Sequence, residues 1–347
     1  MRRQELREKD KQVFNMIIED FLKIGKPVSS ESIAQKSQVR VSPATVRNIM
    51  VKLEEHGFLF QPHTSAGRIP TDEGLRFYVN NLLAELEWPE ENLSFPFEDL
   101  STAKSDISAL LNQASNILAE YSDNLGFVIY PRISKINFHH VRFIKVSEES
   151  VMIILASLSN LILTRVFNTE TYFTQVELDK ASQYINQSFK GKNFIFIRNY
   201  LLRELPKYRL KYEIIINRLI SLLKAYFSQE EEGNQIVLQG VPKLLEKHYL
   251  IDMESLKSLF RNFEEKAKLT KLISSFISLG RVKVLIGSEL SIPDISGFSL
   301  ILSHYGDKDQ VLGSLGIIGP KFIPYRKIIP LVDCVAKRLS QTMSLSS

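Results

Sequence analysis

The sequence has little cysteine and no long apolar run. Cys334 is the only cysteine in 347 residues, which excludes an internal disulfide framework and a metal site built from several cysteines. No segment approaches the roughly 18 consecutive apolar residues that span a bilayer. The first residues, MRRQELREKDKQ, lack the apolar part of a secretion signal. We therefore expect a cytoplasmic protein without a membrane partner.

Residue patterns typical of catalysis and cofactor binding are also missing. The three glycines between residues 313 and 319 do not form the dinucleotide-binding pattern, and no Gly-Lys-Ser/Thr follows them. His139 and His140 begin an expected strand, so their side chains point to opposite faces and fit one metal ion poorly. Cys334 lies on the apolar stripe of the last helix and has no histidine near it in sequence. We expect no enzyme activity, no metal and no cofactor.

The composition is otherwise that of a globular protein with a mild basic bias. Apolar residues make up 44% of the chain, and its length favours two or three domains. The formal net charge is +5, and residues 1–70 hold twelve basic and eight acidic side chains. This uneven distribution favours an anionic partner for the N-terminal part without identifying that partner.

Apolar residues at helical spacing predict two helices at the start of the chain. The first covers about residues 5–24 and stops before Gly25 and Pro27. Ser29 or Ser30 can cap a short second helix, because a serine oxygen accepts a hydrogen bond from a free amide of the first turn.

A third helix has the clearest beginning. Ser42 can cap it, and Pro43 suits the first helical position because no amide donor is needed there. Gly57 ends the helix. One face is apolar and consists of Val46, Ile49, Met50 and Leu53. The outward face is small and mostly polar and consists of Ala44, Thr45, Arg47, Asn48, Val51 and Lys52.

The segment after Gly57 is expected to form a two-stranded ribbon. Residues 58–61 and 68–70 flank the loop PHTSAG, and Thr71 is expected to cap a fourth, longer helix. Two helices, a capped third helix and a ribbon follow one another in the order of a winged helix-turn-helix, whose recognition helix lies in the DNA major groove.

Candidate DNA contacts lie on the third helix and in the ribbon. Arg47 can pair with guanine or clamp a phosphate, and Asn48 can pair with adenine. Arg68, at the expected tip of the ribbon, can enter a minor groove or bind a phosphate, and His63 either contacts phosphate or braces the turn. The complete set is Ser42, Ala44, Thr45, Arg47, Asn48, Lys52, His63, Thr64, Ser65, Gly67 and Arg68. The alternative is a capped helical hairpin over residues 29–57 with a solvated polar face.

The rest of the chain alternates between strand-rich and helix-rich parts. We expect a linker at 88–100, where proline and acidic residues interrupt the helical pattern. Branched and aromatic runs between 125 and 167 predict consecutive strands. Residues 174–280 are mainly helical except for IVLQG at 236–240, and strands return from residue 282. This order indicates an α+β fold in which a helical segment is inserted into one sheet domain.

Residues 27–79, from PVSSESIAQKSQ to TDEGLRFYV, resemble the N-terminal region of the HrcA family of heat-inducible transcription repressors. The run from Pro62 to Tyr78 is the most specific part. The resemblance continues more loosely through VELDKASQYINQSFKG, IGSELSIPDISGFSLILSHYG and LGSLGIIGP. It therefore covers nearly the whole chain.

This resemblance implies a fold and a function. It implies a winged-helix DNA-binding domain at 1–87, a GAF-like domain at 101–173 and 281–347, and a dimerising domain inserted at 174–280. It also implies a homodimer that binds an inverted-repeat operator in double-stranded DNA upstream of chaperone operons and blocks their transcription. Repressors of the family depend on the GroEL chaperonin for activity, and heat shock diverts that chaperonin to unfolded proteins.

The sequence departs from the family pattern near its end. After GIIGP the family continues with Thr-Arg-Met, where this chain has residues 321–323, KFI, and Pro330 is expected to interrupt the start of the last helix. These departures argue against a ligand site in the GAF-like domain, and they do not affect the interpretation of the DNA-binding part. One rival hypothesis is a winged-helix regulator of other genes, controlled by a small molecule in the GAF-like domain. An enzyme is the second rival, and no motif supports it.

Overall fold

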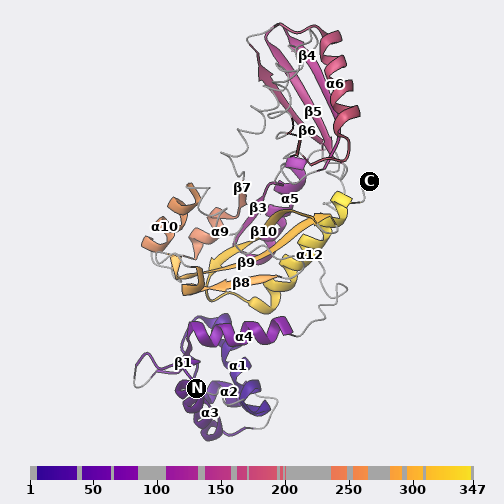
Figure 1. The fold of residues 1–347 in the computed structure, drawn as a ribbon. Helices are drawn as coiled ribbons and strands as arrows, with labels where there is room; N and C mark the ends of the chain where they lie inside the picture. Colours follow the sequence, from indigo (N-terminus) through magenta and orange to yellow (C-terminus); the bar gives the residue numbers. More distant parts are fainter. Residues whose placement is uncertain are drawn as a thin grey trace.

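The structure is a computed structural model. This structure describes residues 6–36, 41–63, 66–84, 107–131, 137–157, 162–169, 172–193, 196–197, 200, 236–247, 253–264, 282–290, 295–307 and 310–344. The predicted linker at 88–100 and the predicted long helix around residues 211–233 lie outside these ranges. The described residues form a mixed helix and sheet fold with three parts (Figure 1).

The N-terminal part is a small helical unit that carries a short hairpin. Its elements are α1 (Glu8–Ile24), α2 (Ser30–Lys36), α3 (Pro43–Glu55), β1 (Leu59–Phe60), β2 (Ile69–Pro70) and α4 (Asp72–Ala84). The expected caps are confirmed: the amide of Ser32 donates to Ser29 Oγ at 3.1 Å and the amide of Gly74 to Thr71 Oγ1 at 3.0 Å. We call α1–α4 with this hairpin the helical unit.

The central part is an antiparallel sheet in the strand order β7-β3-β10-β9-β8. Its strands are β3 (Leu125–Ile129), β7 (Ile236–Gln239), β8 (Lys283–Ile286), β9 (Phe298–Asp307) and β10 (Gln310–Pro320). The helices that pack on this sheet are α5 (Ile107–Ser122), α9 (Val241–Glu246), α10 (Met253–Glu264) and α12 (Tyr325–Ser344).

Each face of the five-stranded sheet has its own core. Val128, Leu315 and Ile317 belong to the core that contains α5 and α12, whereas Phe127 and Leu300 belong to the core that contains α9 and α10. All five residues of β3 are buried for this reason. The sheet and its helices, with the 3-10 turn η5 (Gly287–Leu290) after β8, are called the sheet unit below.

A third part holds β4 (Phe138–Ser147), β5 (Ser150–Ser157), β6 (Ile162–Asn168) and α6 (Gln175–Phe189). These strands form a separate antiparallel sheet in the order β4-β5-β6, and α6 packs against it. The expectation that they share one sheet with the strands after residue 282 is therefore wrong. β5 shows the physical reason, because its residues alternate between buried and half-buried, as in a strand with one face covered by a helix.

The strand expected at IVLQG is confirmed, since its residues 236–239 form β7, which pairs with β3 at the edge of the five-stranded sheet. A further expectation is wrong. Pro330 was expected to interrupt the start of the last helix, yet α12 runs through it and the residue is buried. Packing against the sheet offsets the lost amide hydrogen bond at this proline.

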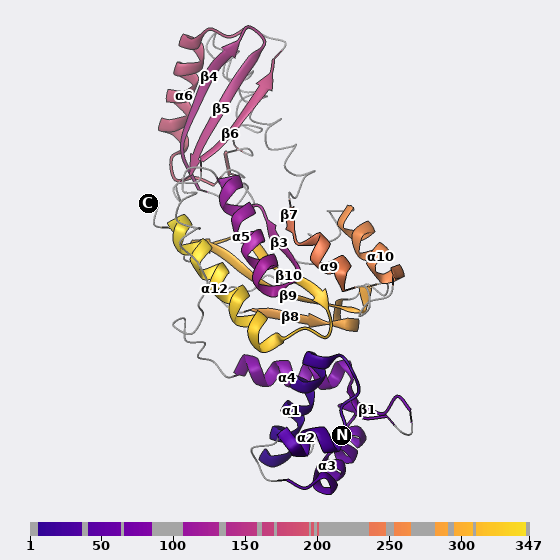
Figure 2. The same ribbon diagram turned by 180° about the vertical axis from the view of Figure 1, so that it is seen from behind.

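The helical unit lies at one end of the molecule. α4 faces β8, while α3 and the β1–β2 hairpin lie on the side away from the sheet unit (Figures 1 and 2). The three-stranded sheet lies at the opposite end. Any contact that α3 makes with another molecule is therefore unobstructed by the described parts of the chain.

Candidate nucleic-acid interface

The beginning of α3 is fixed by its cap. Ser42 Oγ accepts a hydrogen bond from the amide of Thr45 at 3.2 Å and lies 2.9 Å from Thr45 Oγ1. Proline at position 43 follows the cap as expected. Both hydroxyls are thus engaged in organising the first turn, although they lie at an exposed surface. This turn holds the adjoining side chains in one orientation.

The predicted faces of α3 are confirmed by burial. Its apolar residues are all buried, namely Val46, Ile49, Met50 and Leu53. Ala44, Arg47 and Asn48 are exposed on the other side. Neither Arg47 nor Asn48 forms a hydrogen bond or an ion pair with any residue that the structure describes. Their polar groups are therefore available to an external ligand.

Two other residues extend this face toward the end of α3. Val51 is 40% exposed although the helix has a complete apolar face elsewhere. Lys52 Nζ lies 3.9 Å from Asp10 Oδ2 on α1, so part of its charge is balanced within the molecule. Residues 44, 48 and 51 are spaced four and three positions apart, which places them along one line on a helix. The helical spacing also predicts that Val51 faces outward, although Val51 is not among the candidate contacts.

The hairpin after α3 is short, and hydrogen bonds join the described residues on either side of its tip. β1 and β2 pair Leu59 with Pro70 and Phe60 with Ile69. In the loop, the amide of Ala66 donates to the carbonyl of His63 at 2.8 Å, and Gln61 Nε2 donates to the carbonyl of Ala66 at 2.9 Å. The His63 side chain is exposed at this turn. The candidates Thr64 and Ser65 lie outside the described residues.

Gly67 and Arg68 lie in the connection between the two strands, just before β2. Arg68 and Val28 exchange two backbone hydrogen bonds of 2.9 Å each. A Cβ atom on Gly67 would lie 2.2 Å from the carbonyl oxygen of Val28, so this close approach requires glycine. Gly67 therefore has a structural role that explains its presence without any ligand.

The Arg68 side chain is turned inward. Its Nε donates to Glu54 Oε2 on α3 at 2.9 Å, and only 15% of the side chain is exposed. The sequence suggested a position at the ribbon tip, whereas the structure places Arg68 beside the end of α3. The contact with Glu54 is not predictable from the sequence, because no local spacing links Glu54 to Arg68 fourteen positions later.

The structure thus brings the candidates together only in part. The cap and the outward side of α3 form one surface, on which Pro43 and Glu55 are exposed as well. The candidates on this surface, together with Val51, are Ser42, Ala44, Arg47, Asn48 and Lys52. We call this surface the α3 face. The start of a helix is also its electropositive end, because unpaired amides of the first turn point outward. Arg47 and this helix end together favour an anion such as a phosphate.

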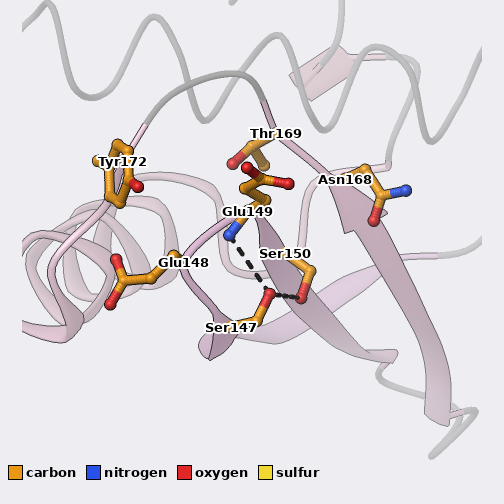
Figure 3. A pocket seen from close by; sticks show the side chains of 7 residues that line it. All are labelled: Ser147, Glu148, Glu149, Ser150, Asn168, Thr169 and Tyr172. Carbon is orange, nitrogen blue, oxygen red and sulfur yellow. Dashed lines mark hydrogen bonds between the residues drawn. The ribbon is translucent and has the colours of Figure 1, made fainter.

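A pocket elsewhere does not resemble a reaction centre. It lies at the turn between β4 and β5 and is lined by Ser147, Glu148, Glu149, Ser150, Asn168, Thr169 and Tyr172 (Figure 3). The hydroxyls of Ser147 and Ser150 lie 2.6 Å apart and are engaged with each other in the turn. Within the described ranges, no group of three or more His, Cys, Asp or Glu residues could hold a metal ion. No helix in those ranges is long and apolar enough to cross a bilayer.

Comparisons with known proteins agree on one family. A family model described as the HrcA protein C-terminal domain matches residues 108–329. A protein of Geobacter sulfurreducens is 33% identical over 339 residues, which cover 98% of each chain. Proteins of Syntrophobacter fumaroxidans and Nitrosomonas eutropha are 31% and 33% identical, cover 98% of this chain, and are covered over 98% and 100% of their own length. All three are named heat-inducible transcription repressor HrcA.

One solved structure has the same fold. It is a crystal structure described only as that of a hypothetical protein, and it matches with a TM-score of 0.68 and 23% sequence identity. The match covers 99% of this chain and 100% of the other chain. At this identity it supports the fold and carries no statement about function.

Proposed function

Because this chain belongs to the HrcA family of heat-inducible transcription repressors, we propose that it represses chaperone genes by binding an inverted-repeat operator as a homodimer. The family names identify a transcription repressor rather than an enzyme. One observation carries the proposal for how DNA is bound: Arg47 and Asn48 lie exposed on a capped helix and have no partner within the described parts of the chain.

In this proposal α1, α2, α3 and the hairpin act as a winged helix, with α3 as the recognition helix. Arg47 supplies bidentate donors for guanine or for a phosphate, and the amide of Asn48 matches the donor and acceptor of adenine. The short side chain of Ala44 lets the backbone approach the bases, and the exposed methyl groups of Val51 suit the methyl group of thymine.

The other candidates take supporting roles. We propose that Lys52, His63, Thr64 and Ser65 contact backbone phosphates beside the groove, since contacts of this type orient a protein without reading sequence. Ser42 and Thr45 organise the first turn of α3 and remain close enough to its exposed side to meet a phosphate. Gly67 and Arg68 hold the hairpin against Val28 and Glu54, so they position the interface.

We also propose a domain division that follows the two sheets. Residues 1–87 remain the DNA-binding part and 88–100 the linker. The GAF-like part would hold α5, β3 and β7–β10 with α12, because these elements share one sheet and its two cores. The inserted dimerising part would then begin with β4 rather than at residue 174 and end before β7, because β4, β5 and β6 form a sheet of their own.

In the proposed homodimer, the α3 faces of the two protomers bind the operator together. Two α3 helices related by a two-fold axis would read matching half-sites separated by about 34–36 Å or a multiple of it. We propose that the dimer needs the GroEL chaperonin to stay active, so that heat, which diverts the chaperonin, releases the operator. This dependence comes from family membership and requires a repressor that inactivates readily without assistance.

Footprinting on the host's chaperonin promoter tests the proposal. Pure protein with added chaperonin is expected to protect both halves of an inverted repeat, and to protect them less when the chaperonin is left out. A promoter with one scrambled half-site is the matched control and should lose protection. Absence of any protected repeat with the chaperonin present would contradict the operator assignment. If a metabolite rather than the chaperonin restored binding, the rival small-molecule regulator would be favoured.

A further inference from the structure

The helical unit is docked on the sheet unit through charged side chains. Arg76 on α4 donates from Nε to Glu289 Oε1 at 2.7 Å and from its terminal nitrogen to the carbonyl of Val284 at 2.6 Å. The same terminal nitrogen also contacts Glu289 Oε2. The amide of Ile286 donates to that oxygen at 2.9 Å, which fixes the orientation of the carboxylate. This forked arrangement has a defined geometry, unlike a single lysine contact.

A second ion pair lies at the beginning of α4. Lys321 Nζ, just after β10, lies 2.8 Å from Asp72 Oδ1. Gly287 has a φ of +56°, and a Cβ atom there would lie 2.2 Å from Asp72 Oδ2. The Asp72 carboxylate therefore lies directly against the backbone of Gly287, whose positive φ also favours glycine.

α1 is attached to the same surface. Arg326 Nε lies 3.2 Å from Glu19 Oε1, and the hydroxyl of Tyr78 on α4 donates to the same oxygen at 3.3 Å. The rings of Phe21 and Phe322 pack edge to face, with centroids 4.8 Å apart. We call this contact the docking interface; its residues are Glu19, Phe21, Asp72, Arg76, Tyr78, Val284, Glu289, Lys321, Phe322 and Arg326.

The charges in the docking interface are complementary and are shared between two helices. The helical unit contributes Glu19, Asp72 and Arg76, and each meets an opposite charge of the sheet unit. The side chains of Arg76 and Lys321 are only 26% and 27% exposed. An isolated surface ion pair contributes little, but a network on two helices with one aromatic contact constrains both position and angle. α1 packs directly on α3, so this constraint extends to the α3 face.

We infer that the docking interface sets the distance between half-sites that the repressor accepts. This inference rests on the proposed function, since it requires a dimer that reads two half-sites. When both helical units are rigidly docked, the two α3 helices stay at a fixed distance, so only one separation between half-sites fits them. Binding to an operator with that separation requires little further ordering of the protein. If the helical units moved freely, the second unit would reach many separations at a lower effective concentration. Arg76, Glu289, Lys321 and Asp72 are thus positioning residues for operator selection.

A series of operators with different spacers tests this inference. The double variant Arg76→Ala/Lys321→Ala is compared with the natural chain on operators whose half-sites are moved by about half a helical turn, and on a duplex with one half-site. The natural chain should bind the operator of one spacing strongly, and its affinity for the other operators should be lower by roughly 100-fold or more. The double variant should bind the operator of the preferred spacing with roughly tenfold lower affinity than the natural chain, and its affinities for the different spacings should differ by only a few-fold. Its affinity for the single half-site should stay the same.

Two controls separate docking from stability. Lys243→Ala removes an ion pair of the same 2.8 Å length, between Lys243 and Glu120 within the sheet unit, and should leave the spacing preference unchanged. Glu289→Gln is a milder change at the docking interface and should give a spacing preference between those of the natural chain and the double variant. Its unfolding temperature should be close to that of the natural chain. This second variant keeps the test valid if the double variant folds poorly.

Each possible result supports or overturns the inference. An unchanged spacing profile in both docking variants would overturn it while leaving the proposed function intact. An equal loss of affinity for the single half-site and for the full operator would show that the residues only stabilise the fold. A natural chain that binds no inverted repeat would overturn the proposed function and, with it, this inference.

Discussion

The α3 face and the docking interface lie on opposite sides of one helical unit, yet they use charged side chains in different ways. Arg47 and Asn48 on α3 have no partner among the residues that the structure describes. Asp72 and Arg76 on α4 are each paired across to the sheet unit. An ion pair made within the molecule reduces the charge that remains for a ligand. The comparison therefore separates residues available to DNA from residues that hold the unit in place.

Arg68 and Lys52 show why exposure and pairing must be considered together. Both are basic and come from the segment that resembles a DNA-binding region. Arg68 is directed to Glu54 and is largely buried, whereas Lys52 is half-exposed and lies near Asp10. Basic side chains near the α3 face thus differ in exposure and in the closeness of their acidic partner. The numbers of lysines and arginines in the sequence do not reveal this difference.

The largest expected effect comes from breaking the contact of the hairpin with Val28, beside which Arg68 meets Glu54 of α3. Gly67→Ala places a methyl group against the backbone of Val28. We expect a loss of roughly 2–4 kcal/mol in the free energy of unfolding and a loss of operator binding. Chemical denaturation measures the first and a gel shift the second. Gly297→Ala is the control, since a Cβ atom there meets nothing within 4 Å; equal stability of the two variants would contradict the role given to Gly67.

Removing the unpaired side chains of the α3 face should have the next largest effect. Arg47→Ala and Asn48→Ala are each expected to cost about 1–3 kcal/mol of operator binding and to relax the preference for particular bases. Thermal unfolding should change little, because neither side chain has an intramolecular partner in the described parts of the chain. Lys257→Ala, an exposed change on α10, is the control. Unchanged affinity in both α3 variants would contradict the assignment of α3 as the recognition helix.

Arg68→Ala distinguishes a paired cation from an unpaired one. We expect it to lower the free energy of unfolding by about 1 kcal/mol, because Glu54 loses its partner. Operator affinity should fall slightly while its dependence on salt stays the same. A residue that contacts a phosphate lowers that salt slope by about 1 when removed. Titrations at several salt concentrations measure the slope, and a clear decrease for Arg68→Ala would place its guanidinium on DNA.

The smallest expected effect concerns pH and the docking interface. Burial, together with the Glu19 carboxylate, raises the pKa of Tyr78 to about 12. The neutral phenol is therefore favoured in the folded state, and the stability it contributes is complete below about pH 10 and is lost as the pH rises toward about 12. At about pH 10.5 this loss is on the order of 1 kcal/mol.

Tyr78→Phe should remove that part of the alkaline loss and change stability little at neutral pH. Denaturation curves of the two proteins at several pH values measure the difference. Burial also raises the pKa values of Tyr305 and Tyr325, but both residues remain in the variant, so the difference isolates Tyr78. Identical alkaline slopes would contradict the buried, neutral state assigned to Tyr78.

Much of the helical unit follows from local sequence features. Ser42 and Thr71 cap the helices that they were expected to cap, and the buried side of α3 is the predicted one. Pairing of strands could not be predicted in the same way. The run LGFVI at β3 and the run SVMIILAS at β5 look alike as apolar segments, but they belong to different sheets. Only their neighbours in space decide which faces are covered.

The sequence by itself determined the family, the helix boundaries of the helical unit and the outward residues of α3. Caps and helical periodicity act over a few neighbouring residues, which is why they can be predicted from a single chain. The tertiary structure decided which charges are paired, because Arg76 and Glu289 are 213 positions apart and meet only after folding. It also turned Arg68 toward Glu54 and left Arg47 unpaired among the described residues, since both outcomes depend on which elements pack together.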